Sequence, residues 1–226
     1  MDPTLYLRAL GGLASLVVIL AASIFIPAGT LHYRQAWVFC AVFSSCVLAI
    51  TVYLMRKDPK LLERRMNAGP AAEKETRQKI IQFFASLSFI SIFVVSGLDH
   101  RFGWSAVPVS VVALGDILVA LGFYLVFLVL RENTFAAGNI QVVPDQQVIA
   151  TGPYALVRHP MYGGALVMLL GIPLALGSWW GLLTIIPMVL VLVLRVLDEE
   201  RLLASDLPGY PEYRNRVKYR LVPLIW

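Results

Sequence analysis

The sequence predicts an all-α, polytopic membrane protein with about six transmembrane helices. Of its 226 residues, 58% are hydrophobic, and the mean hydropathy is +0.74, above the roughly half-apolar usage that is typical of soluble domains. Charged residues make up only 15% and are clustered, which leaves several uncharged stretches near the ~20 residues that a helix needs to cross a bilayer. We therefore expect four N-terminal spans followed by a C-terminal helical hairpin, with a long polar loop and a polar tail outside the membrane.

The four N-terminal spans are long apolar runs. The first is too long, and has the wrong flanks, for a cleaved signal peptide with a small-residue cleavage site, so we treat it as part of the mature fold. The fourth contains one isolated acid, Asp116, which is either a proton-relay residue or a side chain that faces a polar cavity. The predicted spans are residues 9–29, 36–55, 80–98 and 108–130.

A further apolar stretch, residues 161–197, is long enough for two helices and is broken near residues 177–181, GSWWG. We interpret it as a tight helical hairpin whose arms barely span the bilayer. Trp179 and Trp180 then lie at the tip of the hairpin, where tryptophan typically anchors a chain at the membrane interface.

The placement of lysine and arginine predicts the orientation, because cytoplasmic loops near the ends of spans carry the positive excess. With the N-terminus inside, all but Arg34 and Arg101 of the 19 basic residues fall in cytoplasmic segments, and both termini are cytoplasmic. The net charge of +5 is then explained by this topology and by attraction to anionic lipid headgroups. The chain lacks the basic and aromatic signatures of a nucleic-acid-binding fold.

Three polar regions face the cytoplasm in this topology: residues 56–79, 131–160 and 195–226. The first mixes both signs of charge and is predicted to be a solvated loop with one or two short helical turns, placed where it can also cover part of a site. The second lacks helical periodicity and carries many turn-forming residues. A segment of this length without regular structure is uncommon in a compact protein unless it is a functional lid or a binding loop.

The end of the second region reads TGPYALVRHPMYGG, residues 151–164. Pro160 is expected to begin a helix, because proline is favoured at the first helical position. The start of a helix offers unpaired N–H groups and the positive end of a dipole, which suit a carboxylate or a phosphate, and Gly163 and Gly164 permit close backbone approach. The alternative is purely structural: Arg158 snorkels to the interface and the tyrosines belong to an aromatic belt.

The last predicted helix leaves the membrane with Arg195 and Glu199 four residues apart on one face, and Glu200 follows directly. Such a pair is either an ordinary surface ion pair or the mark of a functional site, because ionisable residues at the end of an apolar span are often functional. The tail YPEYRNRVKY supplies tyrosines and bases that are expected to fold over the same surface.

The block GPYALVRHPMYGG, the apolar hairpin and the later RVLDEERLL…LPGYPEYRNRVKYRLVP together resemble the isoprenylcysteine carboxyl methyltransferase family and its relatives among the phospholipid N-methyltransferases. The resemblance covers roughly residues 131–223 and depends on two motif blocks in a fixed order with a helical hairpin between them. It divides the chain into a four-span N-terminal membrane region, residues 1–130, and a C-terminal methyltransferase region, residues 131–226.

The resemblance implies an integral membrane enzyme that uses S-adenosylmethionine at its cytosolic face and needs no metal. Arg195 would face the methyl acceptor and, with Arg158, orient an acceptor carboxylate through a charge-assisted fork. For an amine or thiol acceptor a proton must leave, and Glu200 or His159 is the candidate base. The residues that the resemblance places at the cofactor are Gln141, Gln146, Gln147, Val148, Ile149, Tyr154, His159, Pro160, Met161, Tyr162 and Glu199.

We therefore expect a membrane methyltransferase for a lipid-like or otherwise apolar small acceptor, with O-methylation of an isoprenylcysteine-type carboxylate favoured. N-methylation of a phospholipid amine or S-methylation of a small thiol is the alternative within this class. An NADPH-dependent reductase of the sterol reductase type is similar in its C-terminal half but generally needs a larger membrane domain. A non-enzymatic scaffold or a transporter is the remaining class, although the chain lacks the paired broken helices of many transporters.

Overall fold

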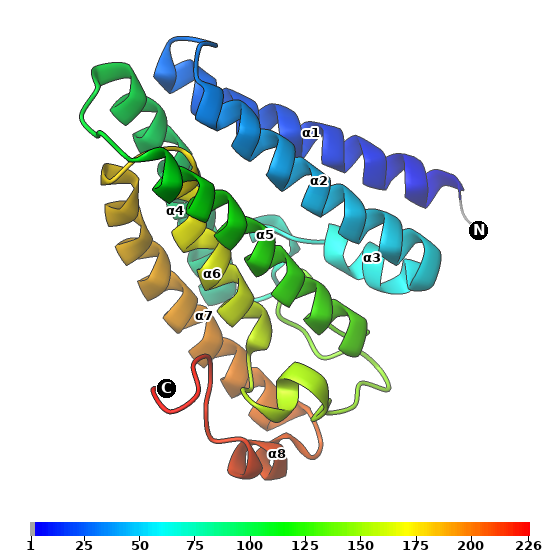
Figure 1. The fold of residues 1–226 in the computed structure, drawn as a ribbon. Coiled ribbons are helices and arrows are strands. Elements are labelled where there is room, and N and C mark those ends of the chain that lie inside the picture. Colours follow the sequence, from blue (N-terminus) through cyan, green and yellow to red (C-terminus); the bar gives the residue numbers. More distant parts are fainter. Residues whose placement is uncertain (1–2) are drawn as a thin grey trace.

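A computed structural model describes residues 3–226, and within this range the chain is helical and contains no strand (Figure 1). Six long helices are joined by short helical pieces and by one long irregular segment between α5 and α6. The elements are α1 (Pro3–Ala28), α2 (Arg34–Lys57), α3 (Pro59–Met66), η1 (Pro70–Ala72), α4 (Thr76–Phe102), α5 (Val109–Glu132), η2 (Gly152–Ala155), α6 (Pro160–Ala175), η3 (Trp180–Thr184), α7 (Ile185–Asp206) and α8 (Tyr210–Arg216).

Five of the helices are long and apolar enough to cross a membrane, so the chain is an integral membrane protein. They are α1, α2, α4, α5 and the continuous segment Trp180–Asp206 formed by η3 and α7. The predicted hairpin is present, with its bend at Gly177, whose φ is +68°. Its first arm, α6, has 16 residues and is about 24 Å long, shorter than the hydrocarbon core of ~30 Å.

Helices α5 and α6 lie side by side, and glycines allow their backbones to touch (Figure 1). A Cβ atom added to Gly115 would lie 2.2 Å from the backbone nitrogen of Ala175, and one added to Gly122 would lie 2.5 Å from that of Met168. Small residues at such contacts are how helices associate closely in lipid, where no hydrophobic force draws them together. This contact fixes α6, and with it the residues at its N-terminal end.

The other end of the hairpin is tied to α4 by buried polar groups. The Asp99 carboxylate accepts hydrogen bonds from the hydroxyls of Ser105 and Ser178. Next to it the ring of His100 stacks on the buried ring of Tyr33, with ring centroids 3.7 Å apart. The turn between the two arms is therefore anchored in the protein, while Trp179 and Trp180 remain exposed as expected for interfacial side chains.

The segment between α2 and α4 packs against the protein more closely than the sequence indicates. The predicted short helical turns are present as α3 and η1. The expected solvated loop is wrong in part, because Leu61, Leu62 and even the charged side chain of Glu73 are buried. The two leucines give α3 an apolar face that packs against the helical bundle. The Glu73 carboxylate forms an ion pair with Arg195.

Candidate active site

One cavity of about 520 Å³ lies where the loop after α5, the start of α6 and the end of α7 meet, within the ~300–1,000 Å³ typical of small-molecule pockets. It has two chemically different parts. The polar part is formed mainly by residues of the 133–149 loop together with side chains of α6, α7 and α8. The apolar part is formed by Ala85, Phe89, Phe123, Val126, Ala165, Met168, Leu169, Met188 and Leu192, which come from α4, α5, α6 and α7.

Most residues singled out from the sequence line this cavity. His159 and Glu199, from motif blocks that are far apart in the chain, are both in its wall, as are Arg158 and Arg195. The other lining residues in the predicted cofactor set are Gln141, Gln146, Gln147, Val148, Ile149, Tyr154, Met161 and Tyr162. Pro160 and Glu200 are not in the lining; Pro160 is the buried first residue of α6.

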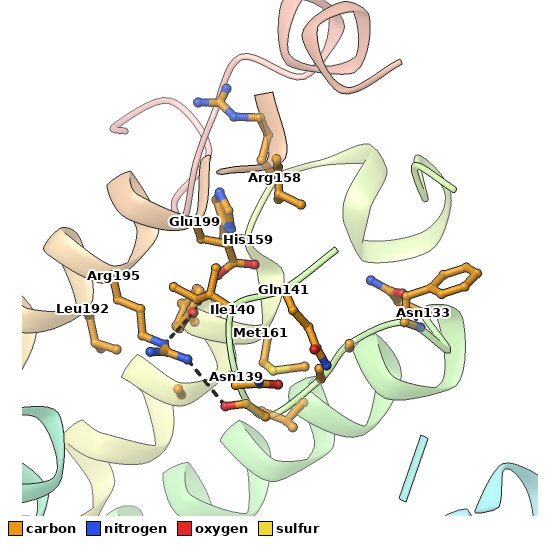
Figure 2. A pocket seen from close by; sticks show the side chains of 18 of the residues that line it. Asn133, Asn139, Ile140, Gln141, Arg158, His159, Met161, Leu192, Arg195 and Glu199 are labelled. Atoms are coloured by element: carbon orange, nitrogen blue, oxygen red, sulfur yellow. Dashed lines mark hydrogen bonds between the residues drawn. The ribbon is translucent and has the colours of Figure 1, made fainter. Parts of the chain in front are cut away.

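Tyr162 connects the two motif blocks. Its hydroxyl donates to Glu199 Oε2 at 2.7 Å and accepts from Arg195 Nε at 3.2 Å. The simple ion pair considered for Arg195 and Glu199 from their spacing is therefore not what the structure contains, because the phenol of Tyr162 lies between them. Figure 2 shows Arg195 reaching from α7 toward the loop that carries Asn139 and Ile140.

The guanidinium of Arg195 is buried and only partly satisfied. Its Nη2 lies 2.8 Å from Glu73 Oε1 in an ion pair and 3.5 Å from the Gly138 carbonyl (Figure 2). Its Nη1 has no hydrogen-bond partner within the part of the chain that the structure describes. A buried donor without a partner is costly, and this one belongs to a side chain that lines the cavity.

The segment between α2 and α4 supplies a second arginine that the sequence did not identify. Arg65 lines the cavity, and its Nη1 lies 3.0 Å from the Ala137 carbonyl and 3.4 Å from the Met161 sulfur. Burial lowers the pKa of Arg65, and the nearby Arg195 lowers it further, against raising effects of Tyr162 and Tyr154. In the sequence, Arg65 is one of several basic residues in a run that mixes both signs of charge. No local sequence pattern separates a basic side chain that is buried from one that stays in water.

Glu200 has a different environment from that expected of a catalytic base. Its Oε1 accepts from Arg158 Nε at 2.6 Å and lies 3.3 Å from His159 Nε2, while its Oε2 accepts from Arg220 Nε at 2.8 Å. The carboxylate is 5% exposed and holds two guanidinium groups. It therefore serves as the anchor that fixes the positions of Arg158 and His159.

The tail folds over this site, as the sequence predicts. The backbone N–H groups of Arg158 and His159 donate to the carbonyls of Tyr219 and Arg220, each at 2.9 Å. The Tyr213 hydroxyl donates to the Tyr154 carbonyl at 2.8 Å. Burial raises the pKa of Tyr154 and raises that of Tyr213 to about 12, so both phenols stay protonated at neutral pH.

The start of α6 offers fewer free N–H groups than expected for an anion site. Pro160 has no N–H, and the N–H groups of Tyr162 and Gly163 donate to the His159 carbonyl at 3.2 and 3.4 Å. The local 3₁₀-like turn satisfies these groups internally. Charged side chains, rather than the helix terminus alone, must therefore provide most of the recognition in this cavity.

Comparison with known protein families gives one match. A family model described as phospholipid methyltransferase matches residues 110–206. The matched segment is somewhat less than half of the chain. No curated protein matches the chain. The earlier resemblance to membrane methyltransferases is thus confirmed at the level of the family.

The matched segment contains nearly all of α5, the loop, α6 and α7, and it includes both motif blocks up to Asp206. Arg65, Glu73, Tyr210 and Tyr213 complete the cavity from outside that region. Within residues 3–226 no three His, Cys, Asp or Glu side chains are grouped so that they would hold a metal ion.

Proposed function

We propose that the protein is an S-adenosylmethionine-dependent methyltransferase that transfers a methyl group to a lipid-like acceptor, with a carboxylate on an apolar chain as the favoured acceptor. One observation carries the proposal: a single cavity joins a polar part to an apolar part, and Arg195 lies on α7 between Leu192 of the apolar part and Glu199 of the polar part. A water-soluble donor and a lipid-borne acceptor can meet in such a cavity.

The polar part fits the chemistry of the donor. Glu199 suits ribose hydroxyls or the ammonium group, and the faces of Tyr154 and Tyr162 suit a sulfonium by cation–π attraction. Residues 141–149 would hold the remainder, together with His159 and Met161. When bound, S-adenosylmethionine supplies an electrophilic methyl group on its sulfonium, and the protein has to align the acceptor and exclude water.

The free Nη1 of Arg195 favours an anionic acceptor. A planar guanidinium binds a carboxylate well, and Arg65 brings a second positive charge to the cavity. A carboxylate is already nucleophilic and needs no base, which agrees with the engagement of Glu200 by Arg158 and Arg220. The side chains of Phe89, Phe123 and Met188 would cover the apolar chain of the acceptor.

A phospholipid amine is the second candidate, because the family model that matches is described as phospholipid methyltransferase. Amine methylation requires removal of a proton, and His159, which lines the cavity, is the candidate base. Amine binding would also have to overcome repulsion from Arg65 and Arg195, which is why we place it second.

We propose that both termini and the cavity face the cytoplasm. The start of α6 and the end of α7 form the cavity, and they lie at the end of the bundle that carries nearly all lysines and arginines. The positive-inside rule assigns this end to the cytoplasm. Labelling of single cysteines at positions 75 and 104 in intact cells tests it, because only position 104 should react from outside.

The direct test uses the purified protein in lipid nanodiscs. Calorimetric titration should show binding of S-adenosylmethionine and no binding of NADPH. Radiolabelled methyl groups should then appear as alkali-labile methyl ester on an S-prenylated N-acetylcysteine, and not on phosphatidylethanolamine in vesicles. Binding of NADPH alone would support a reductase, and methyl transfer to the vesicle lipid would support the amine acceptor. Binding of neither cofactor would refute the proposal.

A further inference from the structure

Glu73 is a charged residue that the proposed reaction does not use, and its side chain is completely buried. Its two carboxylate oxygens have different partners: Oε1 lies 2.8 Å from Arg195 Nη2, and Oε2 accepts from the backbone N–H of Ile140 at 3.0 Å. The side-chain exposure is 0% for Glu73 and 8% for Arg195. One carboxylate thus joins three separate parts of the chain: the segment before α4, the cavity loop and α7.

The connection between this segment and the loop extends beyond Glu73. Arg64 donates to the Thr134 carbonyl at 2.8 Å and accepts at its own carbonyl from the Gly138 N–H at 3.1 Å. The Asn139 side chain donates to the Ala72 carbonyl at 2.9 Å. With the bonds of Arg65 and Glu73, these contacts hold residues 134–140 along one side.

Gly138 shows how closely the two segments approach. A Cβ atom at this position would lie 2.8 Å from the Cβ of Ala68 and 2.9 Å from the Arg65 carbonyl. Only glycine fits without a shift of the backbone. The position of the loop is therefore set by residues 64–73, which lie outside the region that matches the family model.

We propose that Glu73 is a positioning residue: it holds the Arg195 guanidinium in the wall of the cavity, and through Ile140 it holds the cavity loop at a fixed distance from that guanidinium. The inference rests on the proposed function, since it assigns Arg195 to the acceptor. A single rigid carboxylate then fixes the distance between the group that orients the acceptor and the loop that would hold the methyl donor.

The charge of Glu73 is essential to this role. Arg195 has Glu73 as its only ion-pair partner among residues 3–226, and Arg65 lies close enough to repel it. Without a negative charge at position 73, the guanidinium is drawn toward Glu199. The Glu199 carboxylate accepts a hydrogen bond from the Tyr162 hydroxyl, which Arg195 also contacts. The guanidinium would then leave the place in the cavity wall from which it is proposed to orient the acceptor.

A double-mutant cycle tests the role through Arg195. Glu73→Gln retains an oxygen that can accept from Ile140 but loses the charge. We expect it to lower kcat on the S-prenylated N-acetylcysteine at least tenfold, with the KM for S-adenosylmethionine changed less than threefold. In an Arg195→Gln background the same substitution should change kcat less than twofold. Glu75→Gln, an exposed carboxylate two residues away, is the matched control and should leave both parameters unchanged.

Equal losses in both backgrounds, or no loss from Glu73→Gln, would overturn the proposal. If Glu73→Gln alone fails to fold, the double variant Glu73→Gln/Arg195→Gln replaces the ion pair with two neutral amides. That variant should fold and bind S-adenosylmethionine yet remain at the turnover of Arg195→Gln. Recovery of full turnover in it would also contradict a role that acts through Arg195.

Hydrogen exchange of the wild-type protein separates this inference from the proposed function. A peptide covering residues 134–141 should exchange slowly, and Glu73→Ala should accelerate its exchange at least tenfold while a peptide within α5 is unaffected. If the wild type neither binds S-adenosylmethionine nor transfers methyl groups, the proposed function fails, but faster exchange still supports the tie between Glu73 and the loop. Unchanged exchange refutes that tie whatever the activity.

Discussion

The Tyr162 hydroxyl lies 2.7 Å from Glu199 and donates its hydrogen to that carboxylate, although 37 residues separate the two in the chain. This bond joins the first turn of α6 to the C-terminal half of α7. Because Arg195 also donates to the same oxygen of Tyr162, one phenol sets the spacing between an acid proposed to hold the donor and a base proposed to hold the acceptor.

Tyr162→Phe should therefore weaken binding of S-adenosylmethionine by about five- to tenfold, which corresponds to the ~1 kcal/mol typical of a lost hydrogen bond. The ring remains, so the fold should be retained. Isothermal titration calorimetry in nanodiscs measures the affinity. Tyr124→Phe, at an exposed tyrosine of α5, is the control, and equal affinities for both variants would argue against the role of the phenol.

Glu200→Gln should lower the thermal stability, because Arg158 would remain buried without its negative partner. Breaking a buried ion pair costs about 3–5 kcal/mol, which for a protein of this size corresponds to a decrease in Tm of about 6–20 °C. Tryptophan fluorescence during heating gives the Tm. The exposed Glu212 of α8 provides the control variant Glu212→Gln; a stability loss of similar size there would remove the special role of Glu200.

Gly122→Val should separate α5 from α6, since the added Cβ would lie 2.5 Å from a backbone nitrogen and 2.7 Å from the Gly164 carbonyl. Overpacking typically costs about 1–3 kcal/mol, and the shift of α6 should also reduce methyl transfer. The same substitution at Gly12 is the matched control, because nothing lies within 4 Å of a Cβ there. A comparison of melting temperatures distinguishes the two, and a wild-type Tm for Gly122→Val would contradict the packing described.

Stability should fall at alkaline pH because of the buried tyrosines beneath the tail. Burial raises the pKa of Tyr213 from 10.0 to about 12. A folded-state pKa above the unfolded value means that the contribution of this phenol is fully present below pH 10 and is lost as the pH rises through 12. Melting curves from pH 8 to 12 should show a shallower decline for Tyr213→Phe than for the wild type, and parallel curves would count against the shift.

The membrane helices were predictable because the bilayer imposes a strict physical demand. A span must be apolar and must satisfy its own backbone, so uncharged runs of about 20 residues identify helices directly. The ends were less predictable: α4 begins at Thr76 and α7 continues to Asp206, because a helix can extend into water with charged residues that hydropathy assigns to a loop.

The site was partly predictable for a different reason. Local features such as Pro160 before an apolar run indicate where a helix begins, and the motif resemblance singled out His159 and Glu199, which line one cavity. Glu73 and Arg65 could not be predicted, because their roles depend on partners more than 60 residues away. The sequence alone does not specify which charged residue in a run of mixed charge forms a hydrogen bond or an ion pair with a residue so far along the chain.

The tail determines when the cavity is complete during synthesis. Arg158 bonds to the carbonyls of Val217 and Lys218, 59 and 60 residues further along the chain. At a translation rate of ~5–20 residues per second, these carbonyls follow Arg158 by roughly 3–12 seconds. A chain that ends before residue 217 therefore contains all five candidate membrane spans but lacks the carbonyls that bind Arg158 in the wall of the cavity.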